Sequence, residues 1–171
     1  HRKFVHAEYE YFGTAIKTRE FIGDLDGDSL TDFLYRGSVV DTNGDPDVKT
    51  FVAEYDPVIT NFRKVWSTHL WRRNDSPIGG YEVGDFDADG RKDFIASGLW
   101  GHVWVVENNG DNSYGVVWQD SIPFTNAFYQ GSGYVDNDGR PEFFIGATSD
   151  GDWTVMFEAD SDNHYSAKLI I

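Results

Sequence analysis

Short runs of alternating or aromatic-rich residues dominate the chain, and they recur between clusters of glycine, aspartate and asparagine. This pattern is typical of β-strands joined by turns, and the apolar spacing of a surface helix is nearly absent. Twelve strands are expected, in three sets of four. They are Arg19–Gly23, Asp32–Arg36, Lys49–Tyr55 and Phe62–Thr68; then Gly80–Gly84, Asp93–Ser97, His102–Glu107 and Tyr114–Gln119; then Tyr129–Gly133, Glu142–Ala147, Trp153–Glu158 and Tyr165–Ile170.

One segment of the chain is repeated three times. It reads GDLDGDSLTDFLY from Gly23, GDFDADGRKDFIA from Gly84 and GYVDNDGRPEFFI from Gly133. The starts are 61 and 49 residues apart, which is too long for hexapeptide or leucine-rich repeats. This spacing suits a four-stranded propeller blade with variable loops. The predicted fold is therefore all-β, a β-propeller segment of about three four-stranded blades.

An orphan outer strand is expected at the N-terminus, because Arg2–Val5 matches Arg63–Trp66 at the same 18-residue distance from the repeated glycine. The whole of 1–171 is then one propeller segment, divided into the strand 1–6 and blades 18–69, 79–120 and 129–171. Closed propellers need about 4–8 blades. We therefore expect either a piece of a larger propeller or a chain that completes its ring with other copies.

Composition narrows the classes of function. Lys and Arg total 14 against 29 Asp and Glu, so the formal net charge of −15 disfavours nucleic-acid phosphates and anionic membranes as partners. Without cysteine there are no disulfides, no cysteine-ligated zinc and no thiol catalysis. No apolar run approaches the ~18 residues of a membrane helix. The start lacks Met and a signal-peptide core, which predicts either processing or a longer parent chain.

Aspartates give the repeated segment its chemistry. In the first two copies they occupy positions 1, 3, 5 and 9 of the loop, where alternate side chains point inward and join the position 7 carbonyl in an all-oxygen cage. Such hard ligands favour Ca²⁺ over zinc or copper, and the ion turns carboxylate repulsion into attraction. The predicted ligands are Asp24, Asp26, Asp28, Leu30 and Asp32 in the first loop and Asp85, Asp87, Asp89, Arg91 and Asp93 in the second.

The third loop departs from this template because position 1 is Tyr134. Asp136, Asp138 and Glu142 are retained, and Arg140 supplies the position 7 carbonyl. This loop has one carboxylate fewer than the others. It could bind calcium weakly with a water molecule in the missing position, or it could bind none, and the sequence leaves both alternatives open. Two calcium ions are therefore expected, and a third is left open.

Two competing interpretations were weighed for these acidic turns. The EF-hand shares the opening of the loop but requires a Glu at position 12 and flanking helices, whereas this chain has Tyr35, Ala96 or Ile145 there. A single turn of this composition is more often a plain hairpin, but three in register favour metal loops. A fourth acidic turn, Asp41–Asp47, has Lys49 at position 9 and is predicted to be solvated.

The loop GDLDGDSLTD, repeated as GDFDADGRKD, and the aromatic strand after it resemble the FG-GAP/VCBS repeats of integrin-α-like and bacterial exported propellers. Tyr11–Gly13 and Ile145–Thr148 are weaker matches to the Phe-Gly and Gly-Ala-Pro elements, with Thr148 in place of proline. The resemblance implies structural calcium on the lower rim and partners on the upper face. It also implies an extracellular or cell-surface location and a role in adhesion, glycan binding or scaffolding.

Carried over to this chain, the upper-face loops are 7–17, 67–77 and 119–128, together with Gly37–Val48. Aromatic side chains there can stack on sugar rings, and arginines can pair with carboxylates of a protein or glycan ligand. The alternative is packing of the aromatics between blades with solvated arginines. The candidate ligand-binding residues are Trp71, Arg72, Arg73, Tyr11 and Phe124.

Catalytic patterns are weak. Glu54, Glu107 and Glu158 recur at the same strand position in every blade, which favours a repeat-wide structural role over a glycosidase carboxylate pair. The histidines show no metal-ligand spacing. The sequence predicts a calcium-stabilised extracellular binding, adhesion or scaffolding module without catalysis of its own. The alternative is a carbohydrate-binding or polysaccharide-degrading propeller, a lyase or hydrolase, whose active site lies on missing blades.

Overall fold

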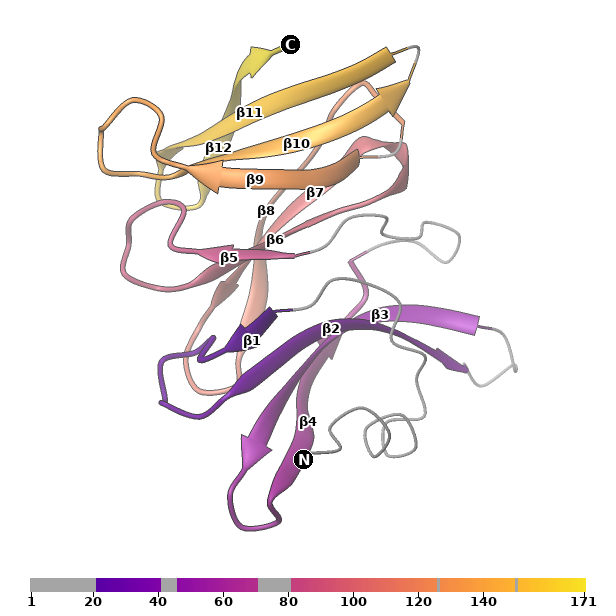
Figure 1. Ribbon diagram of the computed structural model, residues 1–171, viewed down its shortest axis with the longest axis vertical. Coiled ribbons are helices and arrows are strands. Elements are labelled where there is room, and N and C mark those ends of the chain that lie inside the picture. Colours follow the sequence, from indigo (N-terminus) through magenta and orange to yellow (C-terminus); the bar gives the residue numbers. More distant parts are fainter. Residues whose placement is uncertain (1–20, 41–45, 71–80, 126, 150) are drawn as a thin grey trace, which may run out of the picture.

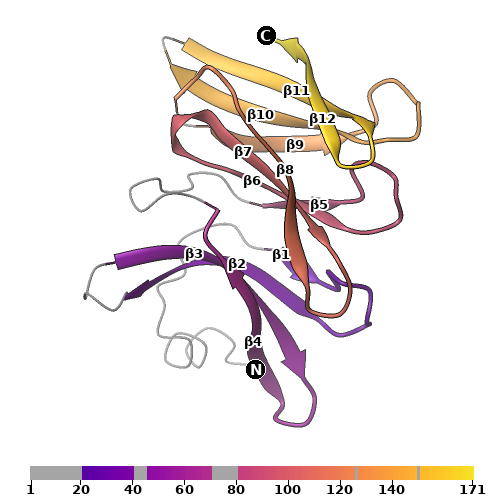
Figure 2. The same ribbon diagram turned by 180° about the vertical axis from the view of Figure 1, so that it is seen from behind.

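The computed structural model describes residues 21–40, 46–70, 81–125, 127–149 and 151–171. Its strands form three antiparallel sheets of four, each built from four consecutive strands, and the sheets are stacked one after another (Figures 1 and 2). The predicted all-β fold with four-stranded units is confirmed. The expected N-terminal strand, 1–6, lies outside the described residues. Within the described ranges no helix has the length and apolar character needed to cross a membrane.

Each sheet runs in chain order from its first to its fourth strand. The first sheet contains β1 (Phe21–Gly23), β2 (Asp32–Val40), β3 (Pro46–Asp56) and β4 (Asn61–Thr68). The second contains β5 (Glu82–Gly84), β6 (Asp93–Ser97), β7 (His102–Asn108) and β8 (Tyr114–Ser121), with a 3₁₀ turn, η1 (Leu99–Gly101), before β7. The third contains β9 (Ala127–Gly133), β10 (Glu142–Ser149), β11 (Gly151–Ser161) and β12 (His164–Ile170).

The third strands of the outer sheets are longer than the sequence pattern predicts. β3 and β11 have 11 residues each, against expected spans of 49–55 and 153–158. Backbone pairing extends them, because ladder hydrogen bonds continue through polar residues that break the apolar pattern. Asp47, expected in a solvated turn, is instead paired with Val39 across β2 and β3. The rest of that turn, 41–45, lies outside the described residues.

A register shift recurs at the equivalent place in all three sheets, where the third strand pairs with the fourth. It falls between Val52 and Ala53, between Val105 and Val106, and between Met156 and Phe157. Such β-bulges increase the local right-handed twist of a strand pair. The strongly twisted outer strands of Figure 1 are consistent with this effect.

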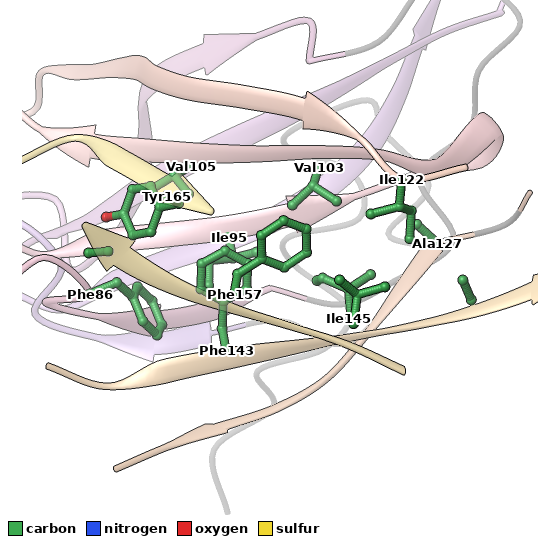
Figure 3. Packing of buried hydrophobic residues seen from close by; sticks show 13 residues of the cluster. Phe86, Ile95, Val103, Val105, Ile122, Ala127, Phe143, Ile145, Phe157 and Tyr165 are labelled. Atoms are coloured by element: carbon green, nitrogen blue, oxygen red, sulfur yellow. The ribbon is translucent and has the colours of Figure 1, made fainter. Parts of the chain in front are cut away.

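Apolar side chains fill the spaces between the sheets. The two-residue period of a strand sends Ile95 of β6 into the core shared with the third sheet, and Phe94 and Ala96 into the core shared with the first. Figure 3 shows the core between the second and third sheets, in which Phe86, Ile95 and Phe143 meet. Because the second sheet is covered on both faces, β6 is buried along its whole length.

The connections are segregated to two edges of the stack. The three repeated acidic loops, which join β1 to β2, β5 to β6 and β9 to β10, share one edge of the molecule, on the left in Figure 1. We call it the acidic edge. The β6–β7 connection lies at the opposite edge, where β10 also ends and β11 begins. This separation places the acidic loops far from the other set of loops.

Candidate metal centres

The three acidic loops adopt the same backbone conformation. Positions 4 and 6 have positive φ in every loop, which turns the chain sharply twice within nine residues. Glycine occupies only some of these positions. The φ values are 87° and 73° at Gly27 and Ser29, 63° and 94° at Ala88 and Gly90, and 66° and 99° at Asn137 and Gly139.

Side-chain to backbone hydrogen bonds hold these turns. The position 2 N–H donates to the position 9 carboxylate, at 2.7 Å from Leu25 to Asp32 and 2.9 Å from Phe86 to Asp93. The position 7 N–H likewise donates to Oδ1 of position 5 in each loop. A loop of nine residues thus folds around its own aspartates, which is the local preference expected of Asp in turns.

Positions 1, 3 and 9 come together in the first two loops. Their carboxylates offer ligand oxygens that lie within 4.8 Å of one another. The two groups are Asp24, Asp26 and Asp32, and Asp85, Asp87 and Asp93. Three convergent carboxylates form the kind of oxygen donor set that a divalent ion binds, although in the first group the Lys92 ammonium also donates to the backbone carbonyl of Asp24.

The position 9 aspartates are the most deeply placed members of these groups. Asp32 and Asp93 are each 0% exposed, and the Oδ1 atom of each has no hydrogen-bond partner in the described part of the chain. Burial, together with the smaller effect of the neighbouring Asp26 and Asp87, raises the pKa of Asp32 to about 6 and that of Asp93 to about 8. A buried, unpaired carboxylate oxygen is costly unless a cation or a proton meets it.

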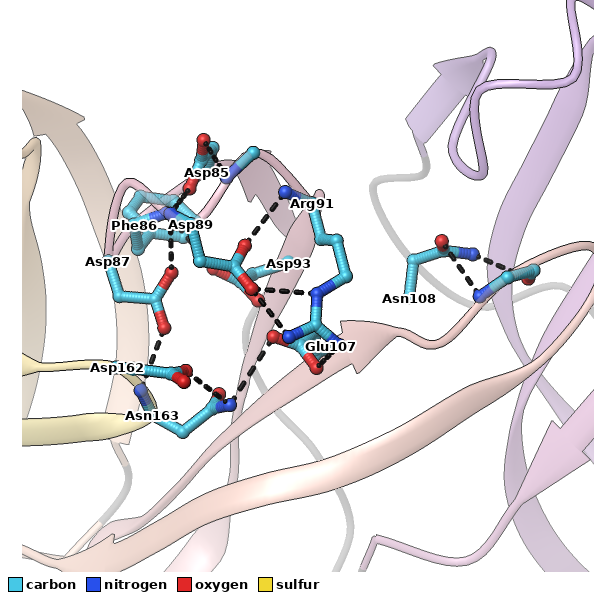
Figure 4. Close-up of polar contacts among 12 residues, drawn as sticks. Asp85, Phe86, Asp87, Asp89, Arg91, Asp93, Glu107, Asn108, Asp162 and Asn163 are labelled. Carbon is cyan, nitrogen blue, oxygen red and sulfur yellow. Dashed lines mark hydrogen bonds and ion pairs between the residues drawn. The ribbon is translucent and has the colours of Figure 1, made fainter.

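Position 5 behaves differently from the prediction of a single cage. Asp28 groups with Asp26, Glu54 and Asp111 of the second sheet. In the second loop the Arg91 guanidinium lies 2.6 Å from Asp89 and 2.8 Å from Glu107 (Figure 4). Ligation by Asp89 would require its carboxylate to leave this partly exposed ion pair, which is weak in solvent.

The third loop forms another grouping. Asp136 and Asp138 lie with Glu158 of β11, whereas Glu142 accepts a 2.7 Å hydrogen bond from the N–H of Val135. The trio of positions 1, 3 and 9 cannot form here because Tyr134 carries no carboxylate and is largely exposed. Glu158, which the sequence analysis assigned to a structural role, thus joins the acidic group of the third loop. Ligation by the carbonyls of Leu30, Arg91 and Arg140 stays a prediction.

The chain from one acidic loop to the next forms its repeating unit, and this unit runs from the loop before β6 to β10 of the next sheet. Residues 85–145 match the FG-GAP-like repeat family. The match begins at position 1 of the second loop and ends in β10, so it spans one complete loop-to-loop unit of the chain. The predicted resemblance is therefore confirmed over these residues, and the sheets have the form of propeller blades. No curated protein matched the chain in the sequence search.

Two asparagines that contact the acidic loops were missed by the sequence analysis. The hairpin of each following sheet brings an asparagine, Asn112 or Asn163, against the acidic loop of the preceding sheet. A signal was present in the sequence, because both hairpins contain the pattern Asp-Asn-x-Tyr, in which x is any residue. It was overlooked because these residues are more than 70 positions away from the loops they contact.

The residues predicted for ligand binding lie mostly outside the described ranges, namely Trp71, Arg72, Arg73 and Tyr11. Phe124 is described, and its ring stacks on Trp153 with centroids 5.1 Å apart. Trp153 is still 38% exposed, and Trp100 in η1 is 63% exposed. These tryptophans, in η1 and near the start of β11, were not among the predicted ligand-binding residues.

Proposed function

We propose that this chain is a calcium-stabilised propeller segment that serves binding, adhesion or scaffolding outside the cytosol and performs no catalysis of its own. The observation that carries the proposal is that Asp32 and Asp93 each converge with two further loop carboxylates and each keep a buried Oδ1 atom that has no hydrogen-bond partner among the described residues. A divalent cation supplies the charge that these oxygens lack.

Calcium is the ion that the donor set favours. Every candidate ligand is a carboxylate or carbonyl oxygen, which suits calcium or magnesium and not the softer metals. Calcium accepts roughly 6–8 oxygen ligands in irregular geometry, whereas magnesium demands a near-ideal octahedron. The first two loops each offer three convergent carboxylates, a set that calcium can complete with further oxygens without octahedral geometry, so calcium fits better. Weak extracellular sites suffice where calcium is abundant, which supports a role outside the cytosol.

A melting experiment tests the metal proposal. Calorimetric melts are recorded in about 5 mM calcium, in the same concentration of magnesium and in chelator. The melting temperature should be highest in calcium, because an ion that binds only the folded state stabilises that state. Asp93→Asn should remove a large part of the calcium shift. The matched control Asp120→Asn, an exposed β8 aspartate outside the loops, should keep it. Identical wild-type midpoints in calcium and chelator would refute the proposal.

Binding, the second element of the proposal, is supported by the aromatic side chains of the opposite edge. Trp100 and the stacked pair Phe124 and Trp153 present ring faces and edges that can stack on a sugar or an apolar protein side chain. A glycan array probed with wild type and Trp153→Ala tests the sugar class. Loss of a signal in Trp153→Ala, with retention in the exposed β8 control Val116→Ala, identifies a lectin, whereas a blank array favours protein scaffolding.

The absence of catalysis is proposed from the contacts of the strand glutamates. Glu54 lies 3.0 Å from Arg63, Glu107 lies 2.8 Å from Arg91, and both are buried. Burial raises the pKa of Glu107, but a general acid also needs room for substrate, and both glutamates are instead engaged by arginines and by the next sheet. Turnover of an acidic or neutral polysaccharide by the purified chain would overturn this part of the proposal and favour the lyase or hydrolase alternative.

A further inference from the structure

The same contact between neighbouring sheets occurs twice. The β7–β8 hairpin of the second sheet reaches the acidic loop of the first, and the β11–β12 hairpin of the third sheet reaches the acidic loop of the second. In both hairpins the contacting residue is an asparagine with positive φ, 54° at Asn112 and 56° at Asn163. Asparagine is among the few non-glycine residues that adopt this conformation readily.

Each asparagine makes two bonds to the sheet before it. The N–H of Asn112 donates to Oδ2 of Asp26 at 2.8 Å, and its Nδ2 donates to Oε2 of Glu54 at 2.9 Å. The N–H of Asn163 donates to Oδ2 of Asp87 at 2.7 Å, and its Nδ2 donates to Oε2 of Glu107 at 3.3 Å (Figure 4).

These bonds fall on residues of the candidate metal centres. Asp26 and Asp87 hold position 3 of their loops and belong to the convergent groups described above. In the second loop, Tyr165, two residues after Asn163, also places its hydroxyl 3.4 Å from Oδ2 of the position 9 Asp93. The following sheet therefore orients both a position 3 and a position 9 carboxylate of the loop before it.

The position 9 carboxylate of the second loop, Asp93, keeps one oxygen available. Oδ2 of Asp93 accepts from the Phe86 N–H and lies within reach of the Tyr165 hydroxyl, while its Oδ1 has no partner among the described residues. One oxygen of the Asp93 carboxylate is thus anchored, and the other is left without a hydrogen bond from the described residues. Anchoring of ligand carboxylates by outer hydrogen bonds is a general way in which proteins tune metal affinity.

We propose that Asn112 and Asn163 are positioning residues for the metal loops of the preceding sheets, so that cation binding to one blade and docking of the next blade strengthen each other. The inference rests on the proposed calcium binding and adds to it a dependence between blades. Thermodynamic linkage makes the effect reciprocal: a docked hairpin raises the calcium affinity of the loop, and calcium tightens the hairpin.

The third loop supplies an internal comparison. No described residue of another sheet bonds to its position 3 Asp136, and its position 2 residue, Val135, is 55% exposed. The equivalent Leu25 and Phe86 are fully buried beneath the next sheet. Because Tyr134 also removes the position 1 carboxylate, this loop should bind calcium more weakly than the other two.

Two substitutions separate the backbone and side-chain parts of the contact. Asn163→Ala removes the amide and disfavours positive φ, so it disturbs both bonds. Asn163→Gly removes the amide but keeps the conformation in which the N–H faces Asp87. The pair Asn112→Ala and Asn112→Gly does the same for the first loop.

Calorimetric calcium titration of the whole chain measures the effect, one loop at a time. In the Asp24→Asn background the second loop is measured, and in the Asp85→Asn background the first. Asn163→Ala should raise the calcium Kd of the second loop about fivefold or more and leave the first unchanged, which is the lower range of typical coupling. Asn112→Ala should give the opposite pattern, and each Gly variant should fall between its Ala variant and the parent.

Hydrogen exchange gives the reciprocal measurement. Calcium should slow exchange of the amides at Asn163 and Tyr165, and Asp85→Asn, 78 positions away from Asn163 in the chain, should abolish that protection. A merely structural role for the asparagine would change the exchange of the hairpin regardless of calcium.

The outcomes are distinct. A parent chain that binds no calcium would overturn the proposed function and the inference with it. Calcium binding with equal Kd values in the parent, Asn163→Ala and Asn163→Gly would overturn the inference alone. Equal weakening of both loops by Asn163→Ala would also overturn it, because general destabilisation does not select the loop of the preceding sheet.

Discussion

The position 2 residue of the acidic loops provides a sharp test of the stacked-sheet arrangement. Phe86 follows an aspartate in a polar loop, yet it is 1% exposed and its ring lies 5.7 Å from that of Phe143 in the next sheet (Figure 3). We predict that Phe86→Ala removes a contact between sheets and not merely a loop side chain.

The expected magnitude follows from this burial. Replacing a fully buried Phe by Ala costs about 3–5 kcal/mol through lost transfer energy and the cavity left behind. Leu25→Ala, at the same position of the first loop and also buried, should cost about 2–5 kcal/mol. Val135→Ala, at the same position of the third loop but largely exposed, should change stability by at most about 0.5 kcal/mol.

Equilibrium urea unfolding followed by tryptophan fluorescence measures all three variants, first in saturating calcium and then in chelator. The free energy of unfolding should fall by several kcal/mol for Phe86→Ala and Leu25→Ala and stay near wild type for Val135→Ala. A loss below about 1 kcal/mol for Phe86→Ala, or an equal loss for Val135→Ala, would refute the packing described here.

Two further predictions follow from single residues. Burial raises the pKa of Asp93 from 3.8 in the unfolded chain to about 8 in the metal-free fold. The fold is therefore stabilised by protonation of Asp93. This stabilisation is complete below about pH 4 and is lost as the pH rises through about 8. In chelator, the free energy of unfolding of wild type relative to Asp93→Asn should therefore decline from pH 5 to pH 8, and a constant difference would contradict the shift. Gly101→Ala should cost more than about 1 kcal/mol in thermal or urea unfolding, because φ is +76° and a Cβ would overlap the carbonyl oxygens of Ile122 and Phe124. Wild-type stability of Gly101→Ala would show that η1 relaxes freely.

Local interactions made much of the architecture predictable from the sequence. Each acidic loop closes through hydrogen bonds from its own N–H groups to its own aspartates, within seven residues, as in Leu25 to Asp32. Such contacts depend on composition and spacing alone, so the repeated motif determines the turn and its flanking strands in all three copies, and the convergence of positions 1, 3 and 9 in the two copies that carry an aspartate at position 1. The strand period similarly fixes that Phe94 and Ile95 face opposite sides.

Tertiary structure decided the contacts that join one sheet to the next. Nothing local to Asp26 or Asp87 specifies Asn112 or Asn163, because the partners lie 86 and 76 residues away and meet only once the sheets stack. The same holds for the Trp153 ring on Phe124 and for the burial of Phe86 against Phe143. Sequence determines a turn because its donors and acceptors are neighbours in the chain, whereas the packing of whole sheets determines which distant side chains share a buried surface.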